Sequence, residues 1–485
     1  MKRLLLVWMM ILCLLPVATM AEENTDALYP IRVNGLWGYM NQAGEAVIEP
    51  QWKQVQCFNG NYALVTTSES RNGLINHSGQ YVVEPQEHLR ITQYDETWQL
   101  EICGTEDYSV GYFDKASGFC LAPNGEYIAL LNWYEDGSGP IPIMNRSEKI
   151  GYLDRKTGAV VISFIYDEVS EDIGFYNGYS IATTVSESCP DEELQFHLID
   201  TTGTEVRFPA GIYAWGGVNE DRLVICSRTG YGLARPDGTI VVEPIYSAMS
   251  WPQEGVISFQ EQHDGVYYSG HMNLDGKIII PAIYHLRGDE NHDSTDDVYW
   301  FENGYAAFDD YAAYGEWPDN CRNVIVSKAG TEVLSIPYRM SDGRLITLNN
   351  TWLLSNGVSE AGLIWYRVCD HEDDYNRVSG AGIRYGLIQV HDDAWVFLTE
   401  PIYERIQDSF PDGVYSPFTD YFSEGLQEVC VNDLWGYINE QAQWVIPPQY
   451  DSADGFRDGL ALVEKDGKLS YIDHDGTVVW EEQWP

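Results

Sequence analysis

Basic residues are scarce in this chain of 485 residues, which has 28 Lys and Arg against 74 Asp and Glu and a formal net charge of −46. So negative a chain repels phosphate groups, which argues against nucleic acid or anionic lipid as a partner. Disorder is excluded too, because 44% of the residues are apolar and the chain has 33 Tyr and 16 Trp, enough for several cores. We therefore expect a folded, very acidic protein.

Long apolar runs are missing after the N-terminus. Residues 1–3 begin with a positive charge, residues 4–17 are almost unbroken apolar sequence, and residues 19–21 supply small side chains for a signal peptidase. No later stretch approaches the roughly 18 consecutive apolar residues of a membrane span. The sequence predicts a signal peptide over 1–21 and a chain that is secreted or associated with the cell envelope, without stable insertion in the membrane.

Closely spaced cysteine pairs are also missing. Eight of the nine cysteines lie after the predicted signal peptide, scattered and without any C-x-x-C motif. An exported protein permits disulfides, and Cys103 with Cys120 is the pair close enough in sequence to suggest a local one. The plainer interpretation is that the cysteines are small buried apolar residues.

The local motifs of hydrolytic enzymes are absent. After His371 and Glu372, Tyr375 stands where a second zinc-ligating histidine would be required, and no G-x-S-x-G sequence marks an activated serine. Carboxylate pairs for glycoside hydrolysis remain open, since their separation in space is not legible from sequence. We expect a non-catalytic protein, with an extracellular carbohydrate-active enzyme as the alternative.

A repeat runs along the chain instead. Its clearest copy reads LWGYIN at 434–439, WVIPPQYD at 444–451 and GLALV at 459–463, and residues 36–65 match it closely. Weaker copies begin near residues 73, 111, 151, 231, 270 and 385. Degenerate copies lie near residues 197 and 323, and a last, incomplete copy covers residues 470–473. The sequence therefore holds about eleven units, spaced by roughly 35 to 60 residues.

Each unit has the pattern of antiparallel strands. Trp435 and Tyr437 alternate with Gly436, as expected of side chains on the two faces of a strand. Asp-Gly pairs at 237–238, 275–276 and 475–476 predict tight hairpins, and each is followed by a β-branched run. We expect these runs to end at prolines such as Pro244 and Pro281, because proline cannot donate a hydrogen bond within a sheet.

The repeat resembles that of the bacterial WG-repeat, or KWG-repeat, proteins. The resemblance implies structural positions in the repeat and no catalytic residue, because this family is recognised by its repeat and not by a reaction. The residues that carry it are Trp37, Gly38, Tyr39, Gly151, Tyr152, Gly232, Trp435, Gly436, Tyr437, Pro448 and Tyr450. We divide the chain into the signal peptide, N-terminal WG-like repeats over 22–290, degenerate repeats with insertions over 291–384, and C-terminal WG-like repeats over 385–485.

An all-β fold of repeated antiparallel meanders is therefore predicted. A propeller-like ring is favoured over an open β-solenoid, because residues 29–33 form a strand without a unit while the last unit stops after Trp480 without its third strand. We expect one end to complete the other. About eleven units exceed the four to eight blades usual in propellers, which keeps the solenoid as the alternative.

Two residue sets are candidates for binding. Trp133, Trp215 and Trp251 lie outside the motif, and indole faces can stack on sugar rings. Carboxylates in two acidic stretches could ligate Ca²⁺, although neither stretch has the spacing of a calcium loop and a solvated insertion explains them as well. These carboxylates are Asp289, Asp293, Asp296, Asp373 and Asp374. No other cofactor is expected.

The resulting functional hypothesis is a secreted, non-catalytic repeat scaffold that binds a protein or a glycan at the cell envelope or outside the cell. It rests on the breadth of surface that repeats present and on the predicted export. A purely structural spacer is a third possibility, and the sequence leaves the oligomeric state open.

Overall fold

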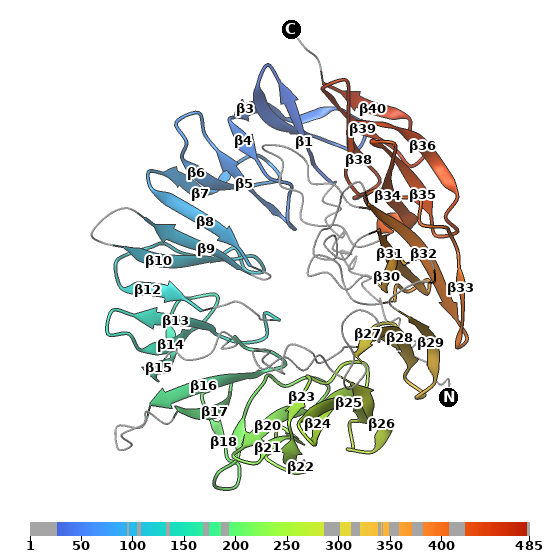
Figure 1. The fold of residues 1–485 in the computed structure, drawn as a ribbon. Coiled ribbons are helices and arrows are strands. Elements are labelled where there is room, and N and C mark those ends of the chain that lie inside the picture. Colours follow the sequence, from blue (N-terminus) through green and yellow to red (C-terminus); the bar gives the residue numbers. More distant parts are fainter. Residues whose placement is uncertain are drawn as a thin grey trace, which may run out of the picture.

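A computed structural model describes residues 27–94, 97–103, 108–131, 136–167, 174–185, 194–285, 301–311, 321–337, 341, 343–348, 358–370, 382–406 and 422–482. These residues form eleven small antiparallel sheets that follow one another around a ring (Figure 1). The predicted all-β, propeller-like fold is confirmed, and the solenoid alternative is wrong. We number the sheets blade 1 to blade 11 in chain order.

The strands of each blade are consecutive in the chain. Blades 1 to 4 contain β1 (Tyr29–Val33), β2 (Leu36–Met40) and β3 (Ala46–Trp52); β4 (Gln54–Val55), β5 (Tyr62–Thr66), β6 (Asn72–Asn76) and β7 (Tyr81–Gln86); β8 (Leu89–Gln93), β9 (Thr97–Ile102), β10 (Ser109–Asp114) and β11 (Cys120–Leu121); and β12 (Tyr127–Leu130), β13 (Ile141–Asn145), β14 (Ile150–Leu153) and β15 (Val160–Tyr166). Blades 5 to 8 contain β16 (Tyr179–Val185), β17 (Leu194–Asp200) and β18 (Glu205–Val206); β19 (Tyr213–Ala214), β20 (Leu223–Ser227), β21 (Gly230–Ala234) and β22 (Ile240–Tyr246); β23 (Ala248–Met249), β24 (Val256–His263), β25 (Val266–Asn273) and β26 (Ile278–His285); and β27 (Tyr305–Tyr311), β28 (Cys321–Ser327) and β29 (Glu332–Pro337). Blades 9 to 11 contain β30 (Leu345–Leu348), β31 (Leu363–Cys369), β32 (Ile383–His391) and β33 (Ala394–Phe397); β34 (Leu426–Val431), β35 (Leu434–Asn439) and β36 (Trp444–Tyr450); and β37 (Ser452–Ala453), β38 (Ala461–Lys465), β39 (Lys468–Ile472) and β40 (Val478–Glu481).

Helical structure is almost absent from the described residues, where the 3₁₀ turn η2 (Ser423–Gly425) precedes β34. Within those residues no helix has the length and hydropathy needed to cross a membrane. The predicted Asp-Gly hairpins are present, since Gly238, Gly276 and Gly476 have φ values between 76° and 89°.

The glycine of the repeat motif faces a bulge in the next strand. In blade 10, Trp435 pairs with Tyr450 and Tyr437 with Ile446, so the partner strand carries two extra residues opposite Gly436. A Cβ atom on Gly436 would lie 2.5 Å from the carbonyl oxygen of Ile446 and 2.7 Å from the nitrogen of Pro448. Gly38 of blade 1 meets the same arrangement, with Ile48 and Pro50 as the neighbours. The bulge therefore explains why this position requires glycine.

The expectation that prolines end the second strand of each unit was wrong. β22 continues through Pro244 to Tyr246, and β26 continues through Pro281 to His285. Both strands lie at the edge of their sheet and both carry a register shift near the proline. A proline at a bulge of an edge strand disrupts no ladder, because no further strand pairs with the outer side of that strand and the lack of an N–H leaves no acceptor without a hydrogen bond.

The tyrosine of the motif connects one blade to the next. Tyr39 and Tyr437 are fully buried. The Tyr39 hydroxyl donates to the carbonyl oxygen of Gln56 at the start of blade 2 (2.8 Å), and the Tyr437 hydroxyl donates to that of Asp454 in blade 11 (2.7 Å). Apolar side chains of neighbouring sheets pack around these rings, so the core is a series of layers between blades.

The asparagine or aspartate after the motif stabilises the following turn. The Asn439 side-chain oxygen accepts hydrogen bonds from the backbone N–H groups of Gln441 and Gln443, and Asn41 and Asp473 do the same in blades 1 and 11. These are Asx turns, in which the side chain replaces a backbone acceptor and fixes the hairpin.

Blades 1 and 11 meet at the closure of the ring, and among the described residues they exchange no strand. β1 pairs with β2 in blade 1, and blade 11 is built from β37 to β40, so the expectation that residues 29–33 complete the last unit was wrong. Each blade instead joins the third strand of one sequence unit to the first two strands of the next. The ring closes through side chains: the Arg32 guanidinium donates to both Glu482 oxygens (2.6 and 3.0 Å), and the Tyr29 and Tyr471 rings lie 5.5 Å apart. We call the contact between blades 1 and 11 the seam.

A buried histidine in blade 7 provides a test of the packing between blades. His271 is fully buried, its ring lies edge-on to Phe301 at 5.1 Å, and burial lowers its pKa to about 4. An unfolded chain protonates this histidine near pH 6.5, whereas the native chain does not until about pH 4. The His271 contribution to stability is therefore complete above pH 6.5 and falls as the pH drops towards 4. We expect His271→Gln to reduce the slope of unfolding free energy against pH in this window, measured by urea unfolding. An unchanged slope would contradict the burial argument.

Candidate functional site

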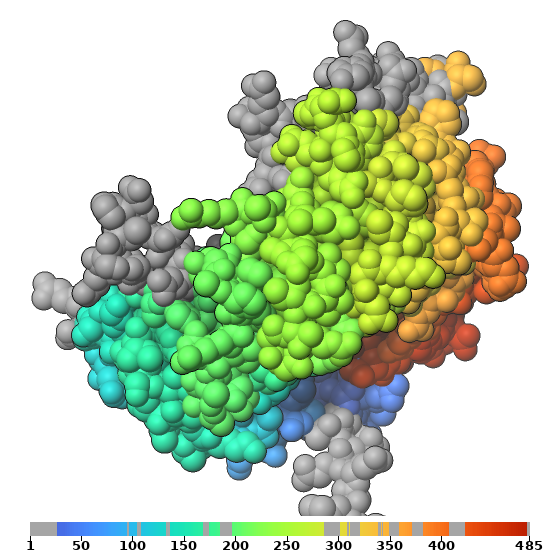
Figure 2. Space-filling model, turned by 90° about the horizontal axis from the view of Figure 1, so that it is seen from below, coloured from blue at the N-terminus to red at the C-terminus, as the bar shows by residue number. Residues whose placement is uncertain are grey.

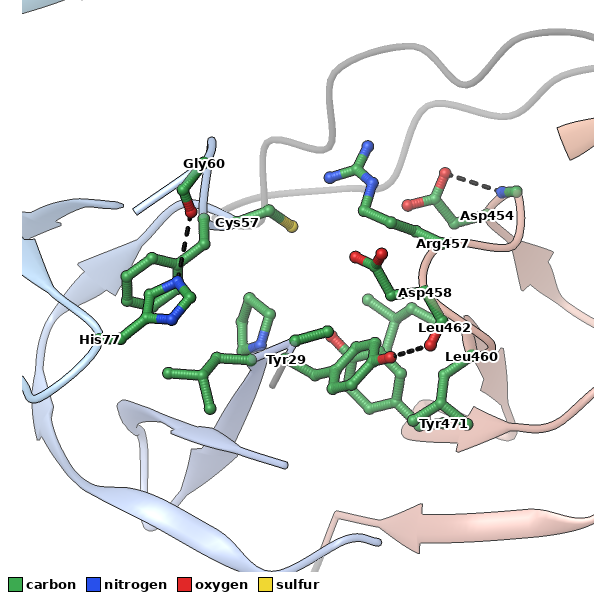
Figure 3. Close-up of a pocket in the computed structure, with 15 residues that line it drawn as sticks. Tyr29, Cys57, Gly60, His77, Asp454, Arg457, Asp458, Leu460, Leu462 and Tyr471 are labelled. Carbon is green, nitrogen blue, oxygen red and sulfur yellow. Dashed lines mark hydrogen bonds between the residues drawn. The ribbon is translucent and has the colours of Figure 1, made fainter. Parts of the chain in front are cut away.

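A cavity of about 290 Å³ lies at the seam. We call it the seam pocket (Figure 3). Tyr29 comes from β1, Cys57 and Phe58 from the loop before β5, and His77 from the turn after β6. Asp458 comes from the turn before β38 and Tyr471 from β39. Segments from blades 1, 2 and 11 therefore meet around one space. The segments of blades 1 and 2 precede that of blade 11 by about 400 residues in the sequence.

Aromatic rings hold the walls of the seam pocket in place. Phe58 packs edge-on against Tyr39 (4.9 Å) and against His77 (4.3 Å), while Tyr29 packs edge-on against Tyr471 (5.5 Å). The Tyr29 hydroxyl donates to the backbone carbonyl oxygen of Asp458 across the seam. These contacts fix the shape of the pocket without using the Asp458 carboxylate.

The cysteine, histidine and tyrosine side chains of the seam pocket are neutral at neutral pH. Burial raises the pKa of the Cys57 thiol to about 11, so the thiol is protonated at neutral pH. Burial also lowers the pKa of His77, which makes the imidazole neutral there. The pKa of Tyr29 is raised, first by burial and then by the charges of Asp458 and Glu424. The pocket thus offers neither a thiolate nor a cationic imidazole.

Carboxylates outnumber cations in the lining. Asp454 and Arg457 carry opposite charges, and Asp458 adds a second negative charge. Among the described residues the Asp458 carboxylate has no hydrogen-bond or ion-pair partner. The two side chains that contact Asp458, Tyr29 and Gln42, donate to its backbone oxygen. In Figure 3 this carboxylate points into the space between the two walls. The pocket therefore presents an uncompensated negative charge beside apolar and aromatic side chains.

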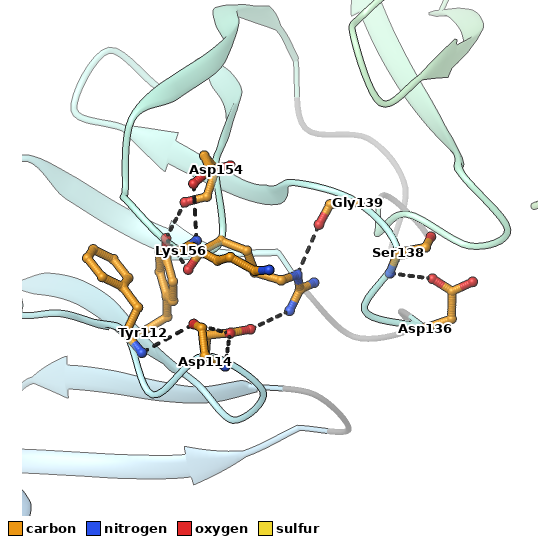
Figure 4. A network of polar contacts seen from close by, with 10 residues as sticks. Tyr112, Asp114, Asp136, Ser138, Gly139, Asp154 and Lys156 are labelled. Carbon is orange, nitrogen blue, oxygen red and sulfur yellow. Dashed lines mark hydrogen bonds and ion pairs between the residues drawn. The ribbon is translucent and has the colours of Figure 1, made fainter. Parts of the chain in front are cut away.

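A second polar cluster, between blades 3 and 4, is structural (Figure 4). Arg155, in the turn after β14, donates to Asp114 at the end of β10 (3.1 Å) and to the carbonyl oxygen of Gly139 (3.0 Å). Asp114 is 1% exposed and also accepts from Ser117. Tyr112 donates to the carbonyl oxygen of Asp154 (3.0 Å). The carboxylate and guanidinium are buried and engaged, so they join two blades and offer nothing to a ligand.

The candidate tryptophans of the sequence differ in their placement. Trp133 lies outside the described residues. Trp215 is 44% exposed and packs against Phe196 and Tyr231, at 5.7 and 5.5 Å between ring centres. Trp251 is half-buried, with its ring against the backbone at Gly216. Neither Trp215 nor Trp251 lines the seam pocket, and glycan stacking on the three tryptophans stays a prediction.

The motif residues occupy equivalent places in their blades. Trp37 and Trp435 are buried opposite Trp52 and Tyr450, and Pro448 lies in the bulge that faces Gly436. Tyr152 is buried and its hydroxyl is 3.1 Å from that of Ser180 in blade 5. Gly151 and Gly232 face the last strands of blades 4 and 6 in the same way as Gly436.

The metal and disulfide candidates yield no site in the described residues. Asp289, Asp293, Asp296, Asp373 and Asp374 all lie outside them. In the part of the chain that is described, no three His, Cys, Asp or Glu side chains are grouped to hold a metal ion. Cys103 and Cys120 are free thiols, so the suggested local disulfide is not formed. Cys103 follows β9 beside the start of β10, whereas Cys120 pairs with Phe113 near the end of β10.

Sequence reasoning missed the seam pocket entirely. Its residues are not unusual in type or spacing, and they meet because the ring closes. One available signal was that Phe58 and Phe456 follow their units at the same place, which marks the loop before the third strand as a repeated feature.

A family description of a WG containing repeat matches residues 37–67, 150–183 and 435–468. No curated protein matches the chain. A eukaryotic initiation factor is similar over 90% of this chain and 96% of its own, at 10% identity and a TM-score of 0.40. BamB from Moraxella catarrhalis is similar over 57% and 92%, at 14% identity and a TM-score of 0.26, and the computationally designed Ika8 protein over 64% and 96%, at 11% and 0.28. Scores this low carry no argument about function.

Proposed function

Because the chain is a WG-repeat protein, we propose that it is a secreted, non-catalytic scaffold that binds a protein or a glycan at the cell envelope or outside the cell. A ring of repeats presents the same strand many times around its circumference, which suits it to wide contacts. The predicted signal peptide over residues 1–21 supports export. The net charge of −46 disfavours nucleic acid and favours a partner with basic groups.

The observation that carries this proposal is a set of exposed apolar side chains on the outermost strands. Seventeen large apolar side chains are exposed among the described residues, and twelve of them belong to the last strand of a blade. We call these twelve the outer belt: Val47, Val160, Val161, Ile165, Ile245, Ile278, Ile283, Val396, Phe397, Trp444, Val445 and Val478. These strands lie at the periphery of the ring, and Figure 2 shows its outer side around blades 6 and 7. Contiguous exposed apolar surface marks an interaction site, and we infer that the belt supplies such surface where it carries neighbouring side chains, as on β15, β33 and β36.

Carboxylates accompany the outer belt. Glu243 lies two residues before Ile245 on β22, and Glu49 lies two residues after Val47 on β3, so each pair projects to the same side of its strand. Both glutamates are exposed. An apolar surface edged with negative charge fits a partner that has apolar and basic side chains together, which favours a protein over a neutral glycan.

Binding of the purified protein to isolated cell-envelope material tests the proposal. We expect saturable binding that is abolished by protease treatment of the envelope and unaffected by glycan hydrolases. The Ile165→Ser, Ile245→Ser double variant should bind at least about tenfold more weakly, because burial of the exposed part of each isoleucine contributes about 1 kcal/mol.

A matched control changes an exposed polar residue beside one of the two isoleucines. Ser163→Ala alters β15 two residues away from Ile165 and leaves the outer belt and its carboxylates intact. This control should keep most of the affinity, and both variants should melt like the parent. Equal binding by the isoleucine variant and the parent would contradict a role for the outer belt, and absence of saturable binding would contradict the scaffold function.

A further inference from the structure

We propose that the seam pocket binds an organic ammonium ion with an apolar body, which Asp458 recognises by charge and Tyr29, Phe58 and Tyr471 by their aromatic rings. The pocket lies at the junction of blades 1, 2 and 11, so this proposal is independent of the outer belt and of any macromolecular partner.

The charge of the lining selects a cation. Asp454 and Arg457 balance each other, His77 is neutral at pH 7, and Asp458 leaves one net negative charge. The carboxylate of Asp458 has no partner among the described residues and points into the cavity, as Figure 3 shows. A carboxylate in this position forms a strong charge-assisted hydrogen bond with an ammonium group.

The apolar lining selects the body of the ligand. Phe58, Leu28, Leu460 and Leu462 line the cavity together with the rings of Tyr29 and Tyr471. Aromatic faces beside a carboxylate form the type of site that attracts ammonium ions through cation–π interactions. A cavity of about 290 Å³ matches the lower end of known small-molecule sites, so the ligand is a small amine and not a polymer.

Occupancy of the pocket also strengthens the seam. The carboxylate and Tyr471 come from blade 11, whereas Phe58 comes from blade 2 and Tyr29 from blade 1. In the part of the chain that is described, no strand links these blades across the seam, and a ligand that contacts both sides adds a connection to the side-chain contacts there. A ligand that binds the folded ring stabilises it in proportion to the logarithm of its concentration above Kd.

The experiment measures binding of 2-phenylethylammonium and of its neutral isostere 2-phenylethanol to the purified protein, by calorimetry and by thermal melting. We expect saturable binding of the amine, about tenfold tighter than that of the alcohol, and a melting temperature that rises with amine concentration. Equal affinities for the two compounds, or no saturable binding of the amine, would overturn the proposal.

Asp458→Asn is the decisive variant. Asp458 has φ 51°, a conformation that asparagine adopts readily, and its backbone contacts with Tyr29 and Gln42 do not need the charge. We expect this variant to bind the amine about tenfold more weakly and the alcohol as the parent does. Unchanged amine binding by the variant would refute the role of Asp458.

Asp466→Asn is the matched control. Asp466 has φ 52° in an exposed turn of the same blade, so the substitution makes the same change in net charge and in turn sequence away from the pocket. It should leave amine binding unaltered. Phe58→Leu keeps the carboxylate while removing one ring, and it should weaken amine binding about threefold. Loss of amine binding in Asp466→Asn would show a long-range charge effect and overturn the proposed site.

Discussion

An Arg155→Met variant is expected to lose about 3 to 5 kcal/mol of unfolding free energy. The substitution leaves the Asp114 carboxylate buried, 1% exposed, without the guanidinium 3.1 Å away, and it leaves the carbonyl oxygen of Gly139 without its donor. A buried charge without a partner is much more costly than the loss of an exposed pair. Urea unfolding followed by tryptophan fluorescence measures the difference.

Two further variants separate the charge from the size of the side chain. Arg155→Met combined with Asp114→Asn should recover part of the loss, because Asn removes the buried charge and still accepts the hydrogen bond from Ser117. Arg71→Met disrupts an exposed pair with Glu69 (3.2 Å) and should cost at most about 1 kcal/mol. If Arg155→Met is no worse than Arg71→Met, the cluster does not join the blades as described.

A Gly436→Ala variant is expected to be destabilised by about 3 kcal/mol. The added methyl group would lie 2.5 Å from the carbonyl oxygen of Ile446 and 2.7 Å from the nitrogen of Pro448, both of them backbone atoms that cannot move aside without opening the bulge. Chemical unfolding of the variant and the parent under identical conditions gives the loss.

Gly467→Ala is the control for the general cost of replacing glycine. Gly467 has φ 75° and open space around it, so alanine there pays for its backbone conformation, about 1 to 2 kcal/mol, but meets no neighbour. Gly436→Ala should therefore be the more damaging of the two. The reverse order would mean that the bulge yields to a methyl group and does not explain the glycine of the motif.

Much of the fold could be predicted from local sequence. The alternation around Gly436 and the Asp-Gly pairs identify strands and hairpins, since both depend on residues within a few positions of each other. The bulge was missed for a physical reason. Pro244 was expected to end a strand, but in an edge strand the ladder continues past a residue that lacks an N–H, because the outer side of that strand has no neighbour to bond.

The candidate site could not be predicted in the same way. Tyr29, Phe58 and Asp458 come together only because blade 11 packs against blade 1, and no local pattern fixes the number of blades at which a ring closes. The pairing of Asp114 with Arg155 was hidden for a related reason. Asp114 stands at the position where Asn439 makes an Asx turn, and its second role depends on a residue of the next blade.

Each blade is built from one continuous stretch of the chain, and this has an evolutionary consequence. Propellers that share a sheet between their two ends must keep the first and last segments matched whenever their length changes. Here every sheet of the described residues is built from consecutive strands, and blades 1 and 11 meet through side chains such as Arg32 and Glu482. Duplication or deletion of a repeat in the genome would therefore add or remove one whole blade while leaving the pairing of every other strand intact. Lineages of this fold can accordingly vary in circumference in steps of a single repeat.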